Sequence, residues 1–366
     1  MATESSVIEA LQAVQDPELH RSVVDLQMVK SVAVNDHLVR VTVAVPTPEY
    51  PLRTELRDRV SAAVSAVPGV SSVAVDLAVM NEAEQKALVE LLQPAGGGGE
   101  RENPFQGART RVLAVASGKG GVGKSSVTTN LSIALAQAGY TVAAVDADVW
   151  GFSMPRMLGI DRPPVVIDTL IVPPSAHGVK LVSMGFFARE DQPVIWRGPM
   201  LHKALEQFLT DVWWDEPQFL VVDMPPGTGD VSLSMAQFLP RAEVIVVTTP
   251  QPAAQKVAQR AAYMAQKVNL TVVGVVENMS WFRGDDGKAY DIFGAGGGQD
   301  LADTLGVPLL GRVPLVRELR EGGDVGRPIT VVDPDNEASQ AFTEIARRVY
   351  EELAPKRVYR KELRIV

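Results

Sequence analysis

Five short runs of almost uninterrupted apolar residues recur between residue 111 and about residue 353 of this 366-residue chain. Stretches with helical spacing of apolar residues separate them. A strand without alternating polar residues is buried on both faces, as in parallel sheets covered by helices on each side. The pattern therefore predicts an α/β fold with a mostly parallel sheet. The runs are VLAVA (112–116), TVAAVD (141–146), FLVVD (219–223), VIVVT (244–248) and TVVGVV (271–276).

The first eighty residues follow a different pattern. Apolar residues share one helix face over 7–14, and LVRVTVAV at 38–45 alternates like a half-buried strand. A second helix is predicted over 52–66, and alternation returns over 70–79. This region therefore reads as a small α+β unit in the order helix, two strands, helix, strand.

A glycine-rich segment separates the two patterns. It contains four consecutive glycines flanked by charged residues and proline, a composition typical of flexible linkers. We predict a small α+β domain over 1–82, a linker over 83–109, an α/β domain over 110–354 and a basic, solvated tail over 355–366.

Composition narrows the function classes. The net charge of −9 argues against nucleic-acid binding, and no apolar run is long enough to predict a membrane span. The N-terminal residues lack the pattern of a secretory signal, and the chain has no cysteine, so we expect a cytoplasmic protein. Without cysteine the chain cannot offer a thiolate to a metal.

The strongest motif is GKGGVGKS at 118–125, which follows the first apolar run and opens a helical pattern. Such a loop points backbone N–H groups at an anion near a helix N-terminus. Lys124 is predicted to neutralise the β- and γ-phosphates of a nucleotide, and the Ser125 hydroxyl to bind Mg²⁺. The nucleotide-binding residues predicted for the whole loop are Gly118, Lys119, Gly120, Gly121, Val122, Gly123, Lys124, Ser125 and Ser126.

Carboxylates end two other apolar runs. Asp223 ends FLVVD, the position of a second magnesium ligand, and the turn PPGTGD at 225–230 follows as a candidate γ-phosphate sensor. Asp146 and Asp148 end the run at 141–146, and carboxyl ends of parallel strands meet at one edge of a sheet. We predict that Asp146 and Asp223 serve the metal and that Asp148 positions the attacking water.

The loop KGGVGKS, with its additional lysine, resembles the deviant Walker A loop of the SIMIBI-class ATPases, the group of ParA, MinD and the nitrogenase iron protein. This resemblance implies that Lys119 reaches across a two-fold interface to the nucleotide of a second copy. A homodimer is then the active form, and hydrolysis is slow and dimer-dependent. A cation supplied in this way stabilises charge that develops on the γ-phosphate, so Lys119 joins Lys124 and Asp148 as a predicted catalytic residue.

Further blocks resemble the Mrp/ApbC branch of that class, whose members carry iron–sulfur clusters. The blocks are VDADVWGFSMPRMLG (145–159), WRGPML (196–201), DMPPGTGDVSLSMAQ (223–237), VTTPQ (247–251), ENMSWF (277–282) and IFGAGGG (292–298). This resemblance implies a P-loop NTPase fold, ATP and Mg²⁺ as cofactors, an adenine contact from Asn278 and packing of Pro314 on that base. DPELHRSVVDLQMVKSV (16–32) resembles the SufT/PaaD-like domain of assembly factors.

The sequence departs from this branch where many members have cysteine. The segment after ENMSWF has no thiol, and Asp285, Asp286 and Gly287 predict a hairpin turn there. Tyr50 stands where the small domain often has a cysteine. The four histidines show no metal-site spacing, although oxygen or imidazole ligands remain an alternative. An iron–sulfur cluster, implied by the family, normally needs thiolates, so the chain is predicted to act as an accessory to a thiol-bearing partner.

Two functions follow from these patterns. The first is a Mg-ATP-hydrolysing Mrp-type ATPase that works with iron–sulfur assembly or recipient proteins. The alternative is a ParA/MinD-like module that binds DNA or membrane when loaded with ATP, against which the net acidity and the short tail weigh. A small-molecule kinase lacks a recognisable acceptor site. We therefore expect neither a membrane nor a nucleic acid as partner.

Overall fold

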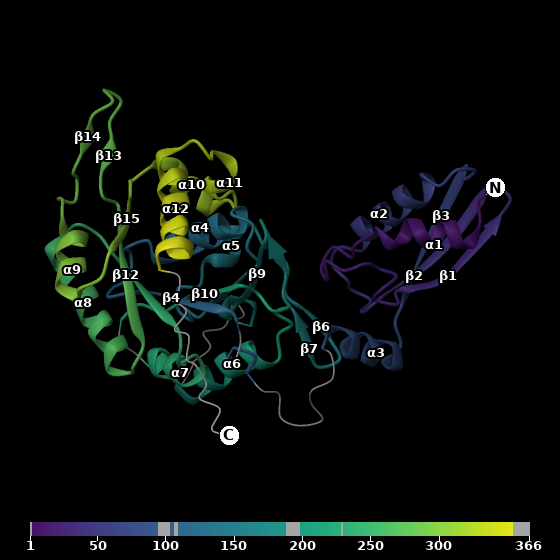
Figure 1. Cartoon of the computed structure of the whole chain (residues 1–366), viewed down its shortest axis with the longest axis horizontal. Helices are drawn as coiled ribbons and strands as arrows, with labels where there is room; N and C mark the ends of the chain where they lie inside the picture. Colours follow the sequence, from purple (N-terminus) through teal and green to yellow (C-terminus); the bar gives the residue numbers. More distant parts are fainter. Residues whose placement is uncertain (1, 94–102, 106–108, 188–197, 228–229, 354–366) are drawn as a thin grey trace, which may run out of the picture.

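The computed structural model describes residues 2–93, 103–105, 109–187, 198–227 and 230–353. These residues form two units, a small one built from the first ninety residues and a larger one that carries the long sheet (Figure 1). The predicted α+β and α/β patterns are thus both present. The basic tail predicted over 355–366 lies outside the described residues.

The small unit has a three-stranded sheet in the order β1-β2-β3, with β1 antiparallel and β3 parallel to β2. Helices cover one face because the alternating strand residues Val39, Val41 and Val43 are fully buried beneath them. Its elements are α1 (Glu4–Gln12), β1 (Val29–Asn35), β2 (Leu38–Val45), α2 (Arg53–Ser65), β3 (Ser72–Val79) and α3 (Glu82–Leu92).

Helix α3 corrects the predicted linker, which was placed from residue 83 onward. Asn81 caps this helix in a capping box with Glu84. Leu88 and Leu92 are buried in the core of the small unit. The helix therefore belongs to that unit, and the connection begins after it. The four glycines of the predicted linker lie outside the described residues.

The larger unit contains an eight-stranded sheet in the order β15-β12-β11-β4-β10-β5-β9-β8, in which only β8 runs antiparallel to its neighbour within the described chain. All five predicted strands are present, and they lie side by side as β12-β11-β4-β10-β5. The strands are β4 (Arg111–Ser117), β5 (Val142–Asp146), β8 (Ser175–Ala176), β9 (Val179–Ser183), β10 (Phe219–Asp223), β11 (Glu243–Thr248), β12 (Thr271–Asn278) and β15 (Leu309–Val313).

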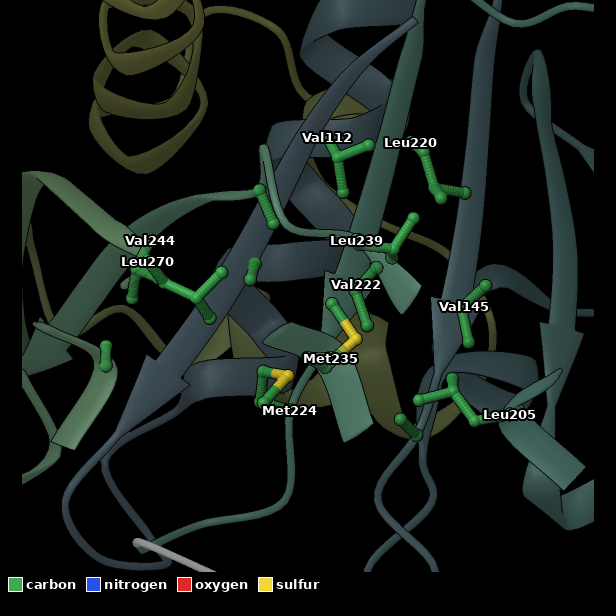
Figure 2. Close-up of a cluster of buried hydrophobic side chains, with 14 of the residues drawn as sticks. Val112, Val145, Leu205, Leu220, Val222, Met224, Met235, Leu239, Val244 and Leu270 are labelled. Atoms are coloured by element: carbon green, nitrogen blue, oxygen red, sulfur yellow. The ribbon is translucent and has the colours of Figure 1, made fainter. Parts of the chain in front are cut away.

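Helices pack on both faces of this sheet, as the continuous apolar strands predicted. One face supports α4 (Lys124–Gln137), α5 (Met154–Leu158), α10 (Arg317–Asp324), α11 (Ile329–Val332) and α12 (Glu337–Arg347). The other supports α6 (Gly198–Thr210), α7 (Asp230–Phe238), α8 (Pro252–Lys267) and α9 (Gly297–Leu305). Figure 2 shows the core between the sheet and this second group of helices, where Leu205, Met235 and Leu239 meet strand residues such as Val145 and Val222. None of the helices in the described ranges is long and apolar enough to cross a membrane.

Two short hairpins complete the larger unit. The first joins β6 (Val165–Ile167) to β7 (Leu170–Val172), and its apolar residues enter the core of the small unit together with Trp213. Two ion pairs also link the units: Arg162 to Glu18 at 2.8 Å and Arg21 to Asp215 at 2.6 Å.

The second hairpin joins β13 (Phe282–Arg283) to β14 (Ala289–Tyr290) and projects from the body in Figure 1. The turn predicted at residues 285–287 is confirmed. The Gly287 N–H donates to the Gly284 carbonyl, and Gly287 has a φ of +76°.

Candidate functional site

The polar residues predicted to converge do so because the strand register places them in one row. Asp223 at the end of β10 lies beside Asp146 at the end of β5. Asp146 in turn lies beside Ser183 at the end of β9. On the other side of the sheet, Asn278 of β12 pairs in register with Val313 of β15. The row marks the carboxyl edge of the sheet, where parallel α/β folds bind ligands.

The glycine loop connects the centre of this edge to helix α4. Gly121 and Gly123 have φ values of +78° and +77°, a region that favours glycine. A Cβ on Gly118 would lie 2.2 Å from the carbonyl carbon of Val257, because α8 packs directly on the loop. Val122 is buried. The loop is therefore held in one shape by its backbone conformation and by α8.

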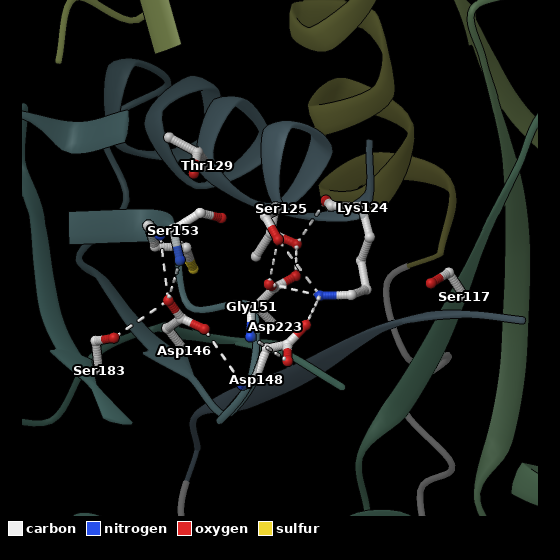
Figure 3. A network of polar contacts seen from close by, with 12 residues as sticks. Ser117, Lys124, Ser125, Thr129, Asp146, Asp148, Gly151, Ser153, Ser183 and Asp223 are labelled. Carbon is white, nitrogen blue, oxygen red and sulfur yellow. Dashed lines mark hydrogen bonds and ion pairs between the residues drawn. The ribbon is translucent and has the colours of Figure 1, made fainter. Parts of the chain in front are cut away.

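Three donors converge on the carboxylate of Asp223, which is fully buried (Figure 3). Lys124 Nζ and Ser125 Oγ each lie 2.6 Å from Asp223 Oδ2. Thr128 Oγ1 lies 2.6 Å from the other oxygen, Oδ1. Lys124 is 6% exposed, so this is a buried ion pair at the mouth of the glycine loop.

Asp146 is held by groups from two neighbouring elements. Its Oδ2 accepts hydrogen bonds from the backbone N–H groups of Ser153 and Met154, at the start of α5, and from the Ser183 hydroxyl. Burial, together with the nearby charge of Asp223, raises the pKa of Asp146 to about 7. Asp146 therefore anchors α5 to the sheet edge in addition to lying beside the predicted metal ligand.

Asp148 lies between Asp146 and the glycine loop. Its Oδ1 accepts the backbone N–H of Gly151 at 3.0 Å, and its Oδ2 is 3.8 Å from Lys124 Nζ. The hydrogen bond fixes the carboxylate within the turn that follows β5. The structure thus brings together Lys124, Asp148 and Asp223, three of the predicted site residues.

Lys119 differs from Lys124 in its surroundings. It is exposed, as is the neighbouring Gly120, and its side chain forms no hydrogen bond or ion pair with any residue that the structure describes. Its backbone carbonyl accepts the Ser117 hydroxyl at 3.1 Å. Ser126 is half-buried in the first turn of α4. The Lys119 ammonium is therefore free to meet a group from outside this chain.

Asn278 and Pro314 lie together at the other side of the loop. Asn278 Nδ2 donates to the Val122 carbonyl at 2.9 Å. Its Oδ1 is buried and has no hydrogen-bond partner within the described part of the chain. Pro314 is buried directly after β15, whose last residue, Val313, pairs with Asn278. An unused buried acceptor beside a glycine loop calls for a donor, which a bound ligand can supply.

The oxygen ligands at this edge suit a magnesium ion. Mg²⁺ takes one or two protein oxygens and completes its shell with phosphate and water, and Ser125 with Asp223 provides such a pair. No group of three or more histidine, cysteine, aspartate or glutamate side chains in the described ranges is arranged to hold a metal ion. Two histidines instead bond serines, His20 to Ser175 and His202 to Ser234.

Sequence reasoning did not identify Thr128. Its signal was a polar residue one helical turn after Lys124, on the face that α4 turns toward the sheet. The predicted sensor turn at 225–230 is described only in part. Within it, the Gly227 N–H donates to the Ser117 carbonyl at 2.9 Å, which ties the turn to the end of β4, directly before the glycine loop.

Comparisons with known proteins agree with this geometry. Residues 108–350 match the ParA family model described as NUBPL iron-transfer P-loop NTPase, and residues 4–77 match a model described as iron-sulfur cluster assembly protein. A protein of Mycobacterium leprae named iron-sulfur cluster carrier protein is 44% identical over 352 residues, which cover 94% of this chain and 91% of that protein. The predicted family resemblance is confirmed.

Two solved structures share the fold of the larger unit. The nucleotide-binding protein of Archaeoglobus fulgidus, in complex with ADP, is 31% identical with a TM-score of 0.54, covering 63% of this chain and 91% of that one. The cell division ATPase MinD of Pyrococcus furiosus is 25% identical with a TM-score of 0.52, covering 67% and 99%. The predicted fold class is confirmed.

Proposed function

The chain belongs to the ParA-like family of iron-transfer P-loop NTPases, and from this membership we propose that it is a Mg-ATP-dependent ATPase that acts in iron–sulfur cluster assembly or transfer. One observation carries the proposal. A glycine loop at a helix N-terminus faces a buried carboxylate that already holds the loop's lysine and serine. This arrangement can bind a triphosphate and its cation in one place.

Nucleotide binding exchanges partners within this site. Lys124 leaves Asp223 for the β- and γ-phosphates, and the loop N–H groups bind the phosphate oxygens. Ser125 and Asp223, with Asp146 next to Asp223, are the residues that would hold magnesium, which would supply charge neutralisation for the phosphates. Asp148, fixed by the Gly151 N–H, is near enough to Lys124 to orient a water at the γ-phosphate.

Two further roles concern atoms that have no partner among the residues that the structure describes, Asn278 Oδ1 and the Lys119 ammonium. Asn278 Oδ1 is an acceptor that fits the amino group of adenine, and Pro314 offers an apolar surface for the ring. Lys119 is exposed and unpaired among the described residues, which supports a role in the site of a second copy. In a homodimer it would place a second cation at the γ-phosphate, where an added charge lowers the barrier to transfer.

An iron–sulfur cluster, the cargo implied by the family, requires thiolate ligands that this chain lacks. Iron–sulfur clusters are held by thiolates, and the sequence has no cysteine. We propose that the chain uses ATP to bind and release a thiol-bearing protein that carries the cluster. A cytoplasmic location, expected from the sequence, remains part of this proposal.

The ATPase proposal is tested with Lys124→Ala and Lys119→Ala beside the wild type. We expect Lys124→Ala to abolish turnover and nucleotide binding. We expect Lys119→Ala to keep nucleotide binding but lose ATP-dependent dimers in analytical ultracentrifugation, together with most turnover. Wild-type turnover in Lys124→Ala would refute the site.

The cargo proposal is tested by anaerobic reconstitution with iron and sulfide, followed by an absorption spectrum and metal analysis. We expect no stable cluster on the chain alone. A stoichiometric cluster would refute the accessory role while leaving the ATPase proposal intact. ATP-dependent co-sedimentation with DNA or lipid vesicles would instead favour a ParA/MinD-like positioning function.

A further inference from the structure

Thr128 presents its hydroxyl to two acceptors but has one proton to donate. The side chain is fully buried, with Oγ1 at 2.6 Å from Asp223 Oδ1 and 2.9 Å from the Lys124 carbonyl oxygen. A carboxylate is the stronger acceptor, and bonds to it are shorter. The proton therefore goes to Asp223, and the usual back-bond of a helical threonine to its own helix is the weaker of the two contacts.

The two oxygens of Asp223 consequently have different partners. Oδ2 is bonded by Lys124 and Ser125, the groups that a nucleotide and its cation recruit. Oδ1 is bonded by Thr128, which lies beneath the loop on the sheet-facing side of α4. When the first two groups turn to phosphate and metal, Oδ2 loses both donors while Oδ1 keeps its donor.

We propose that Thr128 is a positioning residue that holds the Asp223 carboxylate in its metal-binding orientation during this exchange. The inference rests on the proposed ATPase function. The hydroxyl is the group that carries this task, because it is the part of the Thr128 side chain that bonds Asp223 Oδ1. Its spacing of four residues from Lys124 places both side chains on one helix face, so the same helix supplies the group that leaves Asp223 and the group that stays.

The test compares Thr128→Val, which removes the hydroxyl at nearly constant volume, with Thr128→Ser, which keeps it. Ser132→Ala is the matched control: Ser132 lies one turn further along α4, is also fully buried, and bonds the Thr128 carbonyl at 2.7 Å rather than Asp223. Binding of a fluorescent ATP analogue is titrated with magnesium and with EDTA. The gain in affinity that magnesium confers is the readout, and thermal unfolding reports on the fold.

We expect the magnesium-dependent gain to fall by about tenfold in Thr128→Val, the usual cost of removing a group that orients a metal ligand. Thr128→Ser and Ser132→Ala should keep the wild-type gain. Thr128→Ala is a second hydroxyl-free variant, expected to match Thr128→Val if the latter folds poorly.

Two results would overturn the inference alone: a wild-type gain in Thr128→Val, or an equal loss in Thr128→Ser and Ser132→Ala, which would indicate packing. A wild type that binds no nucleotide under either condition would overturn the proposed function and the inference with it.

Discussion

The contact between the two units contains a buried charge, the carboxylate of Glu18, that one substitution would leave without its counter-ion. Glu18 of the small unit is 2% exposed, and its carboxylate is bonded by Arg162 Nε at 2.8 Å. Arg162 also reaches the Ser175 carbonyl at 3.4 Å. Arg162→Met keeps much of the apolar stem but removes the charge, leaving Glu18 buried without its cation.

The expected cost follows from burial and depends on pH. Removing one partner of a buried ion pair costs about 3–5 kcal/mol. Arg162 is 22% exposed, so we expect the lower end, about 3 kcal/mol, at pH 8. Burial already raises the pKa of Glu18 even with Arg162 present, and losing Arg162 raises it further. A folded-state pKa above the unfolded value means that the proton is bound more tightly in the folded protein, so the loss grows as pH rises and shrinks toward pH 5.

Urea unfolding monitored by tryptophan fluorescence measures this loss of stability, because Trp213 is part of the core that the two units share. Arg40→Met is the control: Arg40 lies 3.9 Å from Asp76 in a pair whose side chains are 63% and 60% exposed, and we expect a change below about 1 kcal/mol. The double variant Glu18→Gln with Arg162→Met should recover part of the loss. An effect of Arg162→Met that equals the Arg40→Met effect, or that does not change between pH 5 and pH 8, would refute the argument.

Two further predictions concern the nucleotide site. Gly118→Ala should destabilise the protein by about 1–3 kcal/mol in denaturant unfolding, because the added Cβ would meet the backbone of Val257. Gly120→Ala is the control and should change stability little, because no atom lies within 4 Å of its added Cβ. Equal effects of the two substitutions would contradict this prediction. The second prediction uses the raised pKa of Asp146, which means that the folded protein without nucleotide binds this proton more tightly than the unfolded chain does. As the pH rises from 5 to 7, the free energy of unfolding of the wild type should therefore fall by up to about 1.4 kcal/mol per pH unit, whereas Asp146→Asn should lack that slope. Parallel stability–pH curves for the two proteins would count against a buried, proton-binding Asp146.

The central strands were predictable because burial on both faces leaves a strong local signature. The strands at the sheet margin were not: β8 has two residues, and β9 and β15 have five each with half-buried positions. Helix α3 was also missed. Asn81 and Glu84 carry the local signature of a capping box, which could have indicated where the helix starts. Only Leu88 and Leu92 are buried on it, so its apolar pattern is weak and its place depends on packing against the small unit.

The candidate site was likewise predictable from the sequence only in part. Convergence of Lys124, Asp146 and Asp223 followed from the rule that parallel strands end at one edge, which needs no knowledge of side-chain contacts. The hydrogen bond of Thr128 and the unused oxygen of Asn278 depend on distances across the fold. No sequence pattern reports such distances, so both had to come from the structure.

The ion pair at the centre of the site links ATP binding to magnesium binding. If a triphosphate takes Lys124 without a cation, Asp223 remains as a buried charge that has lost its counter-ion, at a cost of about 3–5 kcal/mol. We therefore expect ATP to bind at least about 100-fold more weakly in EDTA than in magnesium. Asp223→Asn removes the charge that must be compensated, so its ATP affinity should respond much less to magnesium, as measured by calorimetry under both conditions. An undiminished magnesium response in Asp223→Asn would show that the metal acts through the phosphates alone and not through this carboxylate.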